Sequence, residues 1–361
     1  MSPANAIEIR QLRIPGYEVL SPVGEGGMST VYLARQMSLD RQVAIKVLSR
    51  EFLDDADMIR RFQMEAETLA RLDHPNIVSV VDRGMIRRHH YFVMEYVDGP
   101  SLKNLLHEEH LTVGLFVDMV EAVGKALSTA HDAGVVHRDV KPSNVLISKD
   151  NSAIKLSDFG IAAILRQRLQ PHTGRSPAAT PMPQELIDNE SQMTIGTAMY
   201  MAPEQALDAS TANARSDVFS FAIMIHEALT GDTPGHEAPL ASRWNRLATR
   251  RTDAILARAL EIEPERRTAS AGELARDIIA SLHPSWKRHR HEPIVDFRGD
   301  GEESSKWLMV TVVLLAVLMV TYAGYSLLTH ENTPLRHFVE YFTAPTPVPT
   351  PTPVDPLSLL P

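Results

Sequence analysis

The most informative stretch of this 361-residue sequence reads His137-Arg-Asp139-Val-Lys141-Pro-Ser-Asn144. It gathers a carboxylate, an amide and basic side chains without the apolar periodicity of a helix or strand, so we expect a functional turn. Further along, Asp158-Phe-Gly160 follows the strand-like residues 154–156. The two aspartates and Asn144 form an oxygen ligand set that suits Mg²⁺ bound together with a substrate phosphate.

Three other motifs flank this turn. The run Gly24-Glu25-Gly26-Gly27 lies between two strand-like segments, where glycines let backbone N–H groups approach phosphates, although such a run is about as often only a tight turn. Lys46 lies in the apolar strand Val43-Ala-Ile-Lys46, and Glu65 on the following helix could neutralise it. Taken alone, Lys46 is more simply an ordinary strand-edge lysine. The last motif is Ala202-Pro-Glu204.

In this order and spacing the motifs resemble those of the eukaryotic-type protein kinases, over residues 17–283. The resemblance implies an α+β fold with a β-rich N-lobe (about 17–97) and an α-rich C-lobe (about 98–283). Residue patterns independently predict the elements of such a fold. The expected strands are residues 17–23, 31–35, 42–48, 77–81 and 91–96, and the expected helices are 55–72, 113–133 and 217–229.

The resemblance also implies a role for each motif residue. Asp139 would deprotonate the attacking hydroxyl, Lys141 would stabilise the transferring phosphoryl group, and Lys46 paired with Glu65 would hold the α- and β-phosphates of ATP. Asn144 and Asp158 would bind Mg²⁺, or Mn²⁺ in its place. The implied nucleotide-binding residues are Gly24, Glu25, Gly26, Gly27, Val31, Ala44, Lys46, Met94, Glu95 and Val97, with the main chain of Glu95 and Val97 on adenine.

By the same resemblance, the residues after Gly160 form an activation segment. Arg138 lies next to Asp139, and the resemblance implies that a phosphate on this segment is needed to neutralise the charge of Arg138. We expect autophosphorylation among Thr173, Thr180, Ser191 and Thr194, with Ser191 and Thr194 favoured because they are nearest to Gly196-Thr197. Thr197 would lie beside the substrate hydroxyl, and Lys141 is typical of the serine/threonine class. Glu204 with Arg267, and Asp217, would be structural.

Two features depart from the family pattern. Ser29 replaces the third glycine of the loop, which costs flexibility but adds a hydroxyl near the phosphates. The stretch between Gly231 and Glu263 is short for the family, so we expect a reduced substrate-docking helix, whereas the activation segment is long.

Residues 308–329 carry no charged side chain and are long enough to cross a bilayer as a helix. Trp307, Tyr322 and Tyr325 would anchor it at the interfaces. Basic residues favour a cytoplasmic N-terminal side, since Lys287, Arg288, Arg290, Arg298 and Lys306 precede the segment and Arg336 follows it. We therefore predict an N-terminal extension (1–16), a juxtamembrane linker (284–306), a transmembrane helix (307–329) in the inner membrane, and a disordered Pro/Thr-rich tail outside (330–361). This organisation resembles the bacterial transmembrane serine/threonine kinases.

The composition of the chain excludes several classes of partner and of site. The net charge of −9 argues against a nucleic-acid partner, and the lack of cysteine excludes a disulfide framework, a thiol nucleophile and Cys-ligated metals. The expected partners are ATP, proteins with Ser/Thr hydroxyls, the lipid bilayer and, by resemblance, a second copy in a homodimer. Two alternatives are a catalytically silent scaffold, which intact Lys46 and Asp139 argue against, and a tail-dependent sensor, whose tail is too short to bury a core.

Overall fold

The structure, a computed structural model, describes residues 13–159, 199–234 and 240–298. The chain divides into the units Met1–Gly299 and Asp300–Pro361, and the second unit falls entirely outside the described residues. The predicted transmembrane helix (307–329) and tail (330–361) also lie there, so both stay predictions. Within the described ranges, no helix has the length and apolar character needed to cross a membrane.

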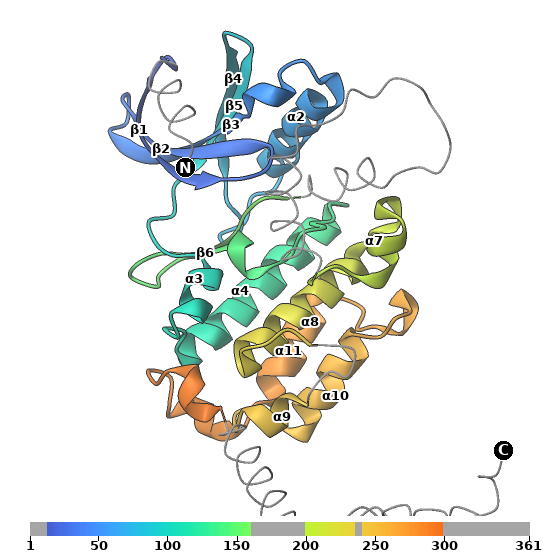
Figure 1. The fold of residues 1–361 in the computed structure, drawn as a ribbon. Helices are drawn as coiled ribbons and strands as arrows, with labels where there is room; N and C mark the ends of the chain where they lie inside the picture. Colours follow the sequence, from blue (N-terminus) through green and yellow to red (C-terminus); the bar gives the residue numbers. More distant parts are fainter. Residues whose placement is uncertain (1–12, 160–198, 235–239, 299–361) are drawn as a thin grey trace, which may run out of the picture. The chain divides into compact units, whose positions relative to one another are not determined.

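The N-terminal part is a five-stranded antiparallel sheet in the order β1-β2-β3-β5-β4, with helix α2 against it (Figure 1). The predicted helix 55–72 and the strands are confirmed, except that the strand expected at 77–81 begins only at Val80. The elements are β1 (Tyr17–Glu25), β2 (Ser29–Gln36), β3 (Arg41–Leu48), α2 (Ala56–Ala70), β4 (Val80–Ile86) and β5 (His89–Glu95).

Helix α2 follows directly from its sequence. Asp55 caps it by accepting the N–H groups of Asp57 and Met58. Its apolar residues at helical spacing, including Phe62, Ala66 and Leu69, are buried, and the ring centroid of Phe62 is 5.1 Å from that of Phe92 on β5. This packing turns the neighbouring Glu65 inward, beneath the sheet.

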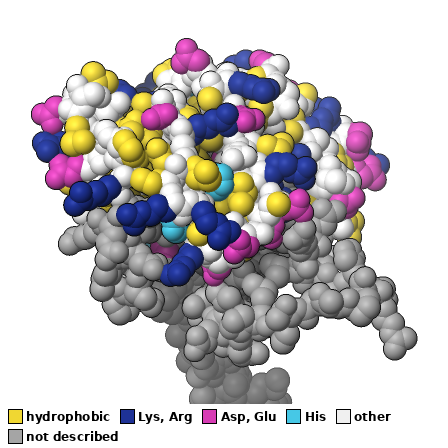
Figure 2. All heavy atoms as spheres, turned by 90° about the horizontal axis from the view of Figure 1, so that it is seen from above, with side chains coloured by type: hydrophobic (Ala, Val, Ile, Leu, Met, Phe, Trp, Pro, Cys, Tyr) yellow, Lys and Arg dark blue, Asp and Glu magenta, His cyan; other side chains and the backbone are white. Residues whose placement is uncertain are grey.

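Strand β3 divides its side chains between two cores. Val43, Ile45 and Val47 pack in a cluster with Ile14, whereas Ala44 and Leu48 belong to the main core shared with α2. Because side chains alternate along a strand, Lys46 lies on the same face as Ala44 and Leu48. Seen from above in Figure 2, the described surface mixes basic, acidic and hydrophobic side chains.

The second part is helical and is built on α4 and α8 (Figure 1). Gly124 on α4 approaches α11 so closely that an added Cβ would lie 2.5 Å from the Cβ of Ala275. The predicted helices 113–133 and 217–229 are confirmed, and α8 begins three residues earlier than expected. The elements are α3 (Leu102–His107), α4 (Val113–Asp132), β6 (Val145–Ile147), β7 (Ile154–Leu156), α7 (Pro203–Leu207), α8 (Ala214–Thr230), α9 (Ala241–Trp244), α10 (Arg250–Ala259) and α11 (Ala271–Ser281).

Residues 284–298, which we call the strap, pack against the start of α4. Backbone N–H groups of Val113 and Gly114 donate to strap carbonyls at 2.9 and 2.8 Å, and the N–H of Ile294 donates to Leu111 O at 2.8 Å. Ile294 is 1% exposed. The part of the predicted linker (284–306) that the structure describes is therefore folded onto the helical lobe.

Candidate active site

The quoted turn brings three predicted residues into direct contact. Lys141 Nζ lies 2.7 Å from Asp139 Oδ2. The Asn144 amide donates from Nδ2 to the main-chain oxygen of Asp139 at 2.8 Å and to its Oδ2 at 3.2 Å. Since the amide nitrogen is used in this way, the Asn144 amide oxygen remains as a candidate metal ligand.

Asp217 holds this turn from below. Its carboxylate accepts the backbone N–H groups of His137 and Arg138, both at 2.7 Å, and contacts His131 Nε2 at 2.8 Å. These contacts agree with the structural role that the resemblance implied for Asp217. Arg138 has a left-handed backbone (φ 68°), an uncommon conformation for a non-glycine residue, and the fully buried Asp217 stabilises it.

His137 joins the turn to the strand before Asp158. Its Nε2 lies 2.9 Å from the carbonyl oxygen of Ser157, and its Nδ1 accepts the N–H of Asp139 at 3.2 Å. A carbonyl can only accept, so the ring is the neutral Nε2–H tautomer. Burial lowers the pKa of His137 in spite of nearby carboxylates, which agrees with a neutral ring.

Lys46 pairs with two carboxylates. Its Nζ lies 2.8 Å from Glu65 Oε1 and 2.5 Å from Asp158 Oδ1. Desolvation alone would lower the pKa of Lys46, but the two carboxylates outweigh it and raise that pKa above its ordinary value. Lys46 in turn holds the pKa of Asp158 below its usual range, against the effect of desolvation.

Glu65 is the weaker acid of this group. It is 3% exposed, and its Oε2 has no hydrogen-bond partner in the described structure. Burial raises the pKa of Glu65 to about 7, even though the opposite charge of Lys46 works against this shift. The Lys46–Glu65 pair expected from the sequence is present, and Asp158 as a second partner of Lys46 was not predicted.

The strand register places the expected nucleotide residues on one face of the sheet. Val31 is opposite Lys46 between β2 and β3, and Ala44 is opposite Met94 between β3 and β5. Directly opposed residues share a face, as do alternate residues of β3, so Val31, Ala44, Lys46 and Met94 line the same side. The loop that contains Gly26 joins β1 to β2, and the Gly26 N–H donates to Ser29 O at 2.8 Å.

Several predicted site residues lie outside the described residues. They are Gly160, Thr173, Thr180, Ser191, Thr194 and Thr197, and their roles stay predictions.

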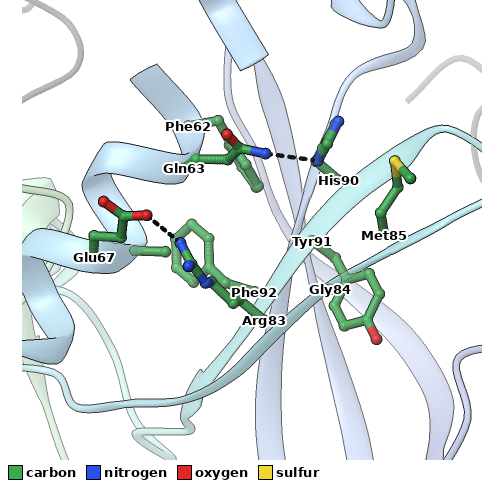
Figure 3. Close-up of a pocket in the computed structure, with 10 residues that line it drawn as sticks. Phe62, Gln63, Glu67, Arg83, Gly84, Met85, His90, Tyr91 and Phe92 are labelled. Carbon is green, nitrogen blue, oxygen red and sulfur yellow. Dashed lines mark hydrogen bonds and ion pairs between the residues drawn. The ribbon is translucent and has the colours of Figure 1, made fainter. Parts of the chain in front are cut away.

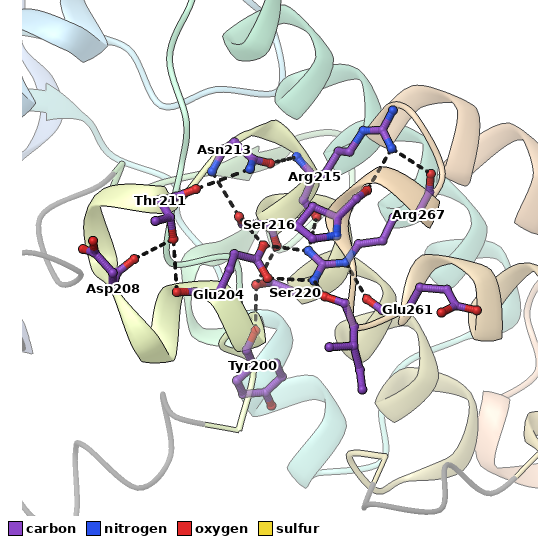
Figure 4. A network of polar contacts seen from close by, with 12 residues as sticks. Tyr200, Glu204, Asp208, Thr211, Asn213, Arg215, Ser216, Ser220, Glu261 and Arg267 are labelled. Atoms are coloured by element: carbon purple, nitrogen blue, oxygen red, sulfur yellow. Dashed lines mark hydrogen bonds and ion pairs between the residues drawn. The ribbon is translucent and has the colours of Figure 1, made fainter.

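A bidentate ion pair braces the helical lobe behind the site (Figure 4). The guanidinium of Arg267 donates to both oxygens of Glu204 at 2.7 Å. It also donates to the carbonyl oxygens of Glu261 and Ile262, and Ser216 Oγ donates to Glu204. Arg267 is 1% exposed, so this pair fixes α7 against α8 and the segment before α11.

Sequence reasoning missed three polar side-chain contacts. His131 contacts Asp217, Lys155 on β7 pairs with Glu95 at 2.7 Å, and Tyr200 donates to Glu227 at 2.6 Å. The available signal was weak in each case. Lys155, for example, is a lone charge between apolar Ile154 and Leu156, which any half-buried strand could contain.

A hollow of about 370 Å³ lies between α2 and strands β4 and β5, away from the catalytic turn (Figure 3). The Glu67–Arg83 and Gln63–His90 contacts flank it. Phe92 lines it and also lies 5.7 Å from Lys46 Nζ by its ring centroid. One aromatic ring therefore separates this hollow from the Lys46 cluster.

The oxygen donors of the site fit a Mg²⁺ ion that is shared with a substrate. In the part of the chain that the structure describes, no group of three or more His, Asp or Glu side chains could hold a metal ion by itself. Asn144 and Asp158 supply one amide and one carboxylate oxygen. Mg²⁺ in proteins commonly takes few side-chain ligands and completes its shell with substrate phosphate and water, so the residues fit a metal that arrives with a nucleotide.

Comparison with known proteins agrees with this geometry. A model of the protein kinase domain family matches residues 17–294. The chain belongs to the protein kinase family. The resemblance to bacterial serine/threonine kinases is also confirmed, because similar curated proteins include PknB of Mycolicibacterium smegmatis (37% identical) and PrkC of Bacillus subtilis (35% identical).

The matches to these two relatives are partial. The aligned regions cover 73% and 74% of this chain but only 42% of PknB and 40% of PrkC, so the chain matches less than half of either relative. Among solved structures, the PknI kinase domain of Mycobacterium tuberculosis is similar, with a TM-score of 0.56 and 31% identity. That match covers 75% of this chain and 98% of the PknI chain.

Proposed function

We propose that this chain is a membrane-anchored serine/threonine protein kinase that transfers the γ-phosphoryl group of ATP to protein hydroxyls. The observation that carries the proposal is the contact of Asp139 with both Lys141 and Asn144 at 2.7–3.2 Å, held by Asp217. The family match and the bacterial relatives support the same activity.

The predicted site residues have defined tasks in this reaction. Asp139 accepts the proton of the attacking Ser or Thr hydroxyl, whose oxygen forms a bond to the γ-phosphorus as the bond to ADP breaks. Lys141 stabilises charge on the transferring group, and Lys46 orients the α- and β-phosphates. Asn144 and Asp158 would hold Mg²⁺, which neutralises phosphate charge when bound.

Autophosphorylation of the segment after Asp158 is part of the proposal. The buried Nε of Arg138 has no hydrogen-bond partner in the described structure. A phosphate is an acceptor that suits a guanidinium, so a modified residue such as Ser191 or Thr194 would satisfy this group. We also propose that the substrates are proteins with Ser/Thr hydroxyls, that the chain forms a homodimer, and that the catalytic domain lies in the cytoplasm.

The test is transfer of labelled phosphate from γ-labelled ATP by the full chain to itself and to a Ser/Thr-containing protein. Asp139→Asn should lower the rate by about a hundredfold or more, because the general base is lost. Asp118→Asn, which removes only an exposed contact to Arg290, is the matched control and should leave the rate unchanged.

Equal label transfer by wild type and Asp139→Asn would refute the enzymatic function. Mapping the labelled peptides from the same reaction tests autophosphorylation, which fails if other proteins are labelled while residues 160–198 stay unmodified. Fractionation of cells that express the full chain and a chain truncated after residue 299 tests the membrane anchor.

A further inference from the structure

Lys155 forms an ion pair that joins the two strands leading to opposite ends of the predicted nucleotide site. It lies on β7, three residues before Asp158, and its Nζ donates to Glu95 Oε1 at 2.7 Å. Glu95 is the last residue of β5, where the family resemblance puts adenine. The Lys155 side chain is 15% exposed and that of Glu95 is 30% exposed, so the pair is partly desolvated.

The Glu95 carboxylate has a second fixed donor. The backbone N–H of Ser79 donates to the same Oε1 at 2.8 Å, and the N–H of Glu95 donates back to Ser79 O at 3.0 Å. Glu95 is thus bound through both its side chain and its main chain. A carboxylate with two donors at these distances holds its backbone in one position.

The segment that contains Ser79 is in turn tied to β7. Val78 N–H donates to Leu156 O at 3.0 Å, and Leu156 N–H donates to Asn76 O at 2.9 Å. Residues 76–79 therefore bridge the end of β5 and strand β7, and Lys155 closes this bridge from the β7 side. The closed arrangement fixes the separation between the main chain of Glu95 and the carboxylate of Asp158.

We infer that Lys155 is a positioning residue for nucleotide binding, which acts through Glu95 and touches neither ATP nor its metal. The inference rests on the proposed kinase function. ATP must contact the end of β5 through adenine and the end of β7 through its phosphates and metal. Lys155 presets the distance between these two contacts, so that binding costs less ordering of the protein.

The simple alternative is that the pair only stabilises the fold. Partly buried ion pairs are weak contributors to stability, because the cost of desolvation offsets much of the attraction between the charges. If the pair had only a stabilising role, its loss would change the unfolding temperature without changing the affinity for nucleotide. The two roles give different measurements.

The experiment measures the dissociation constant of Mg·ADP by calorimetry, together with the KM for ATP and for a protein substrate, on the full chain. Lys155→Met should raise the Mg·ADP dissociation constant and the ATP KM by roughly three- to tenfold and leave the protein-substrate KM unchanged. Lys155→Arg keeps a donor and should restore binding to within about twofold. Lys125→Met, which breaks the exposed pair with Glu121, is the control.

Glu95→Gln completes a double-mutant cycle. If Lys155 acts through Glu95, adding Lys155→Met to Glu95→Gln should weaken binding by less than Lys155→Met does alone. Unchanged Mg·ADP affinity in Lys155→Met, with or without a lower unfolding temperature, would overturn the inference. Failure of the wild-type chain to bind Mg·ADP would overturn both the inference and the proposed kinase function, whereas Mg·ADP binding without phosphate transfer would overturn only the latter.

Discussion

At the scale of single residues, Glu65 determines an unusual pH dependence. Its folded-state pKa of about 7 lies above the ordinary value of 4.5, so the folded protein binds this proton more tightly than the unfolded chain does. The contribution of Glu65 to stability is therefore fully present below about pH 4.5, and it decreases as pH rises to about 7. Above that pH both states are ionised and the contribution is constant.

Glu65→Gln isolates this effect, because glutamine resembles the protonated carboxyl and does not titrate. The free energy of unfolding of wild type minus that of Glu65→Gln should fall between pH 4.5 and 7 and then level off. Urea unfolding of the unit Met1–Gly299 at several pH values measures it. A difference that instead rises with pH below about 4.5 and is flat between 4.5 and 7 would mean that Lys46 lowers the pKa of Glu65 more than burial raises it.

At the scale of elements, the Glu204–Arg267 pair should be a major support of the helical lobe. Arg267→Ala leaves the partly buried Glu204 carboxylate without its partner and removes donors from the carbonyl oxygens of Glu261 and Ile262. Loss of one partner of a buried pair costs about 3–5 kcal/mol of unfolding free energy. We expect a loss of that size in urea unfolding.

Arg266→Ala is the matched control. Arg266 is the neighbour of Arg267 in the sequence, and its guanidinium pairs with Glu263 at the surface, where both side chains are more than 60% exposed. Its cost should stay below about 1 kcal/mol. If the two alanine variants lose equal stability, the buried pair does not brace α7 and α8.

The sequence predicted elements well where local patterns alone determine them. Strand β3 was predicted from the mostly apolar run of residues 43–48, all of which are buried, and helix α2 was predicted because the burial of residues such as Phe62 follows the period of 3.6. The start of β4 was wrong because Ile77 and Val78 are buried by pairing with β7 and by the core, and not as part of the sheet. Two adjacent apolar residues give the same sequence pattern whether they lie in a strand of the sheet or in a core segment outside it.

In the candidate site too, residues in local motifs could be predicted from the sequence, whereas contacts made by the tertiary fold could not. The pair of Lys46 with Glu65 was predicted from the family resemblance, and Asp139 and Asn144 were recognised as site residues because they belong to one motif at fixed spacing. Lys155 with Glu95 could not be predicted, because the partners are 60 residues apart, and the resemblance gave Glu95 only a main-chain role and Lys155 none. Contacts that only the tertiary fold creates leave no local signal.

At the scale of the whole molecule, the strap changes where the catalytic unit ends. A boundary at residue 283 was expected because the resemblance to the kinase family extends over residues 17–283. The strap instead supplies carbonyl acceptors to Val113 and Gly114 and buries Ile294. Because these acceptors satisfy N–H groups in the first turn of α4, residues 1–283 should be less stable than residues 1–299.

Gly114 gives a test whose sign depends on the strap. An added Cβ at Gly114 would lie 2.7 Å from the carbonyl oxygen of Arg290, too close unless the strap moves. Gly114→Ala should therefore destabilise residues 1–299, whereas in residues 1–283 the better helix former should be neutral or stabilise by up to about 1 kcal/mol. Urea unfolding of the four proteins measures both effects, and Ile294→Ala in residues 1–299 should cost about 2–5 kcal/mol as an independent check. If Gly114→Ala has the same effect with and without the strap, residues 284–298 are not bound to α4 in solution, and the catalytic unit ends where the sequence alone placed it.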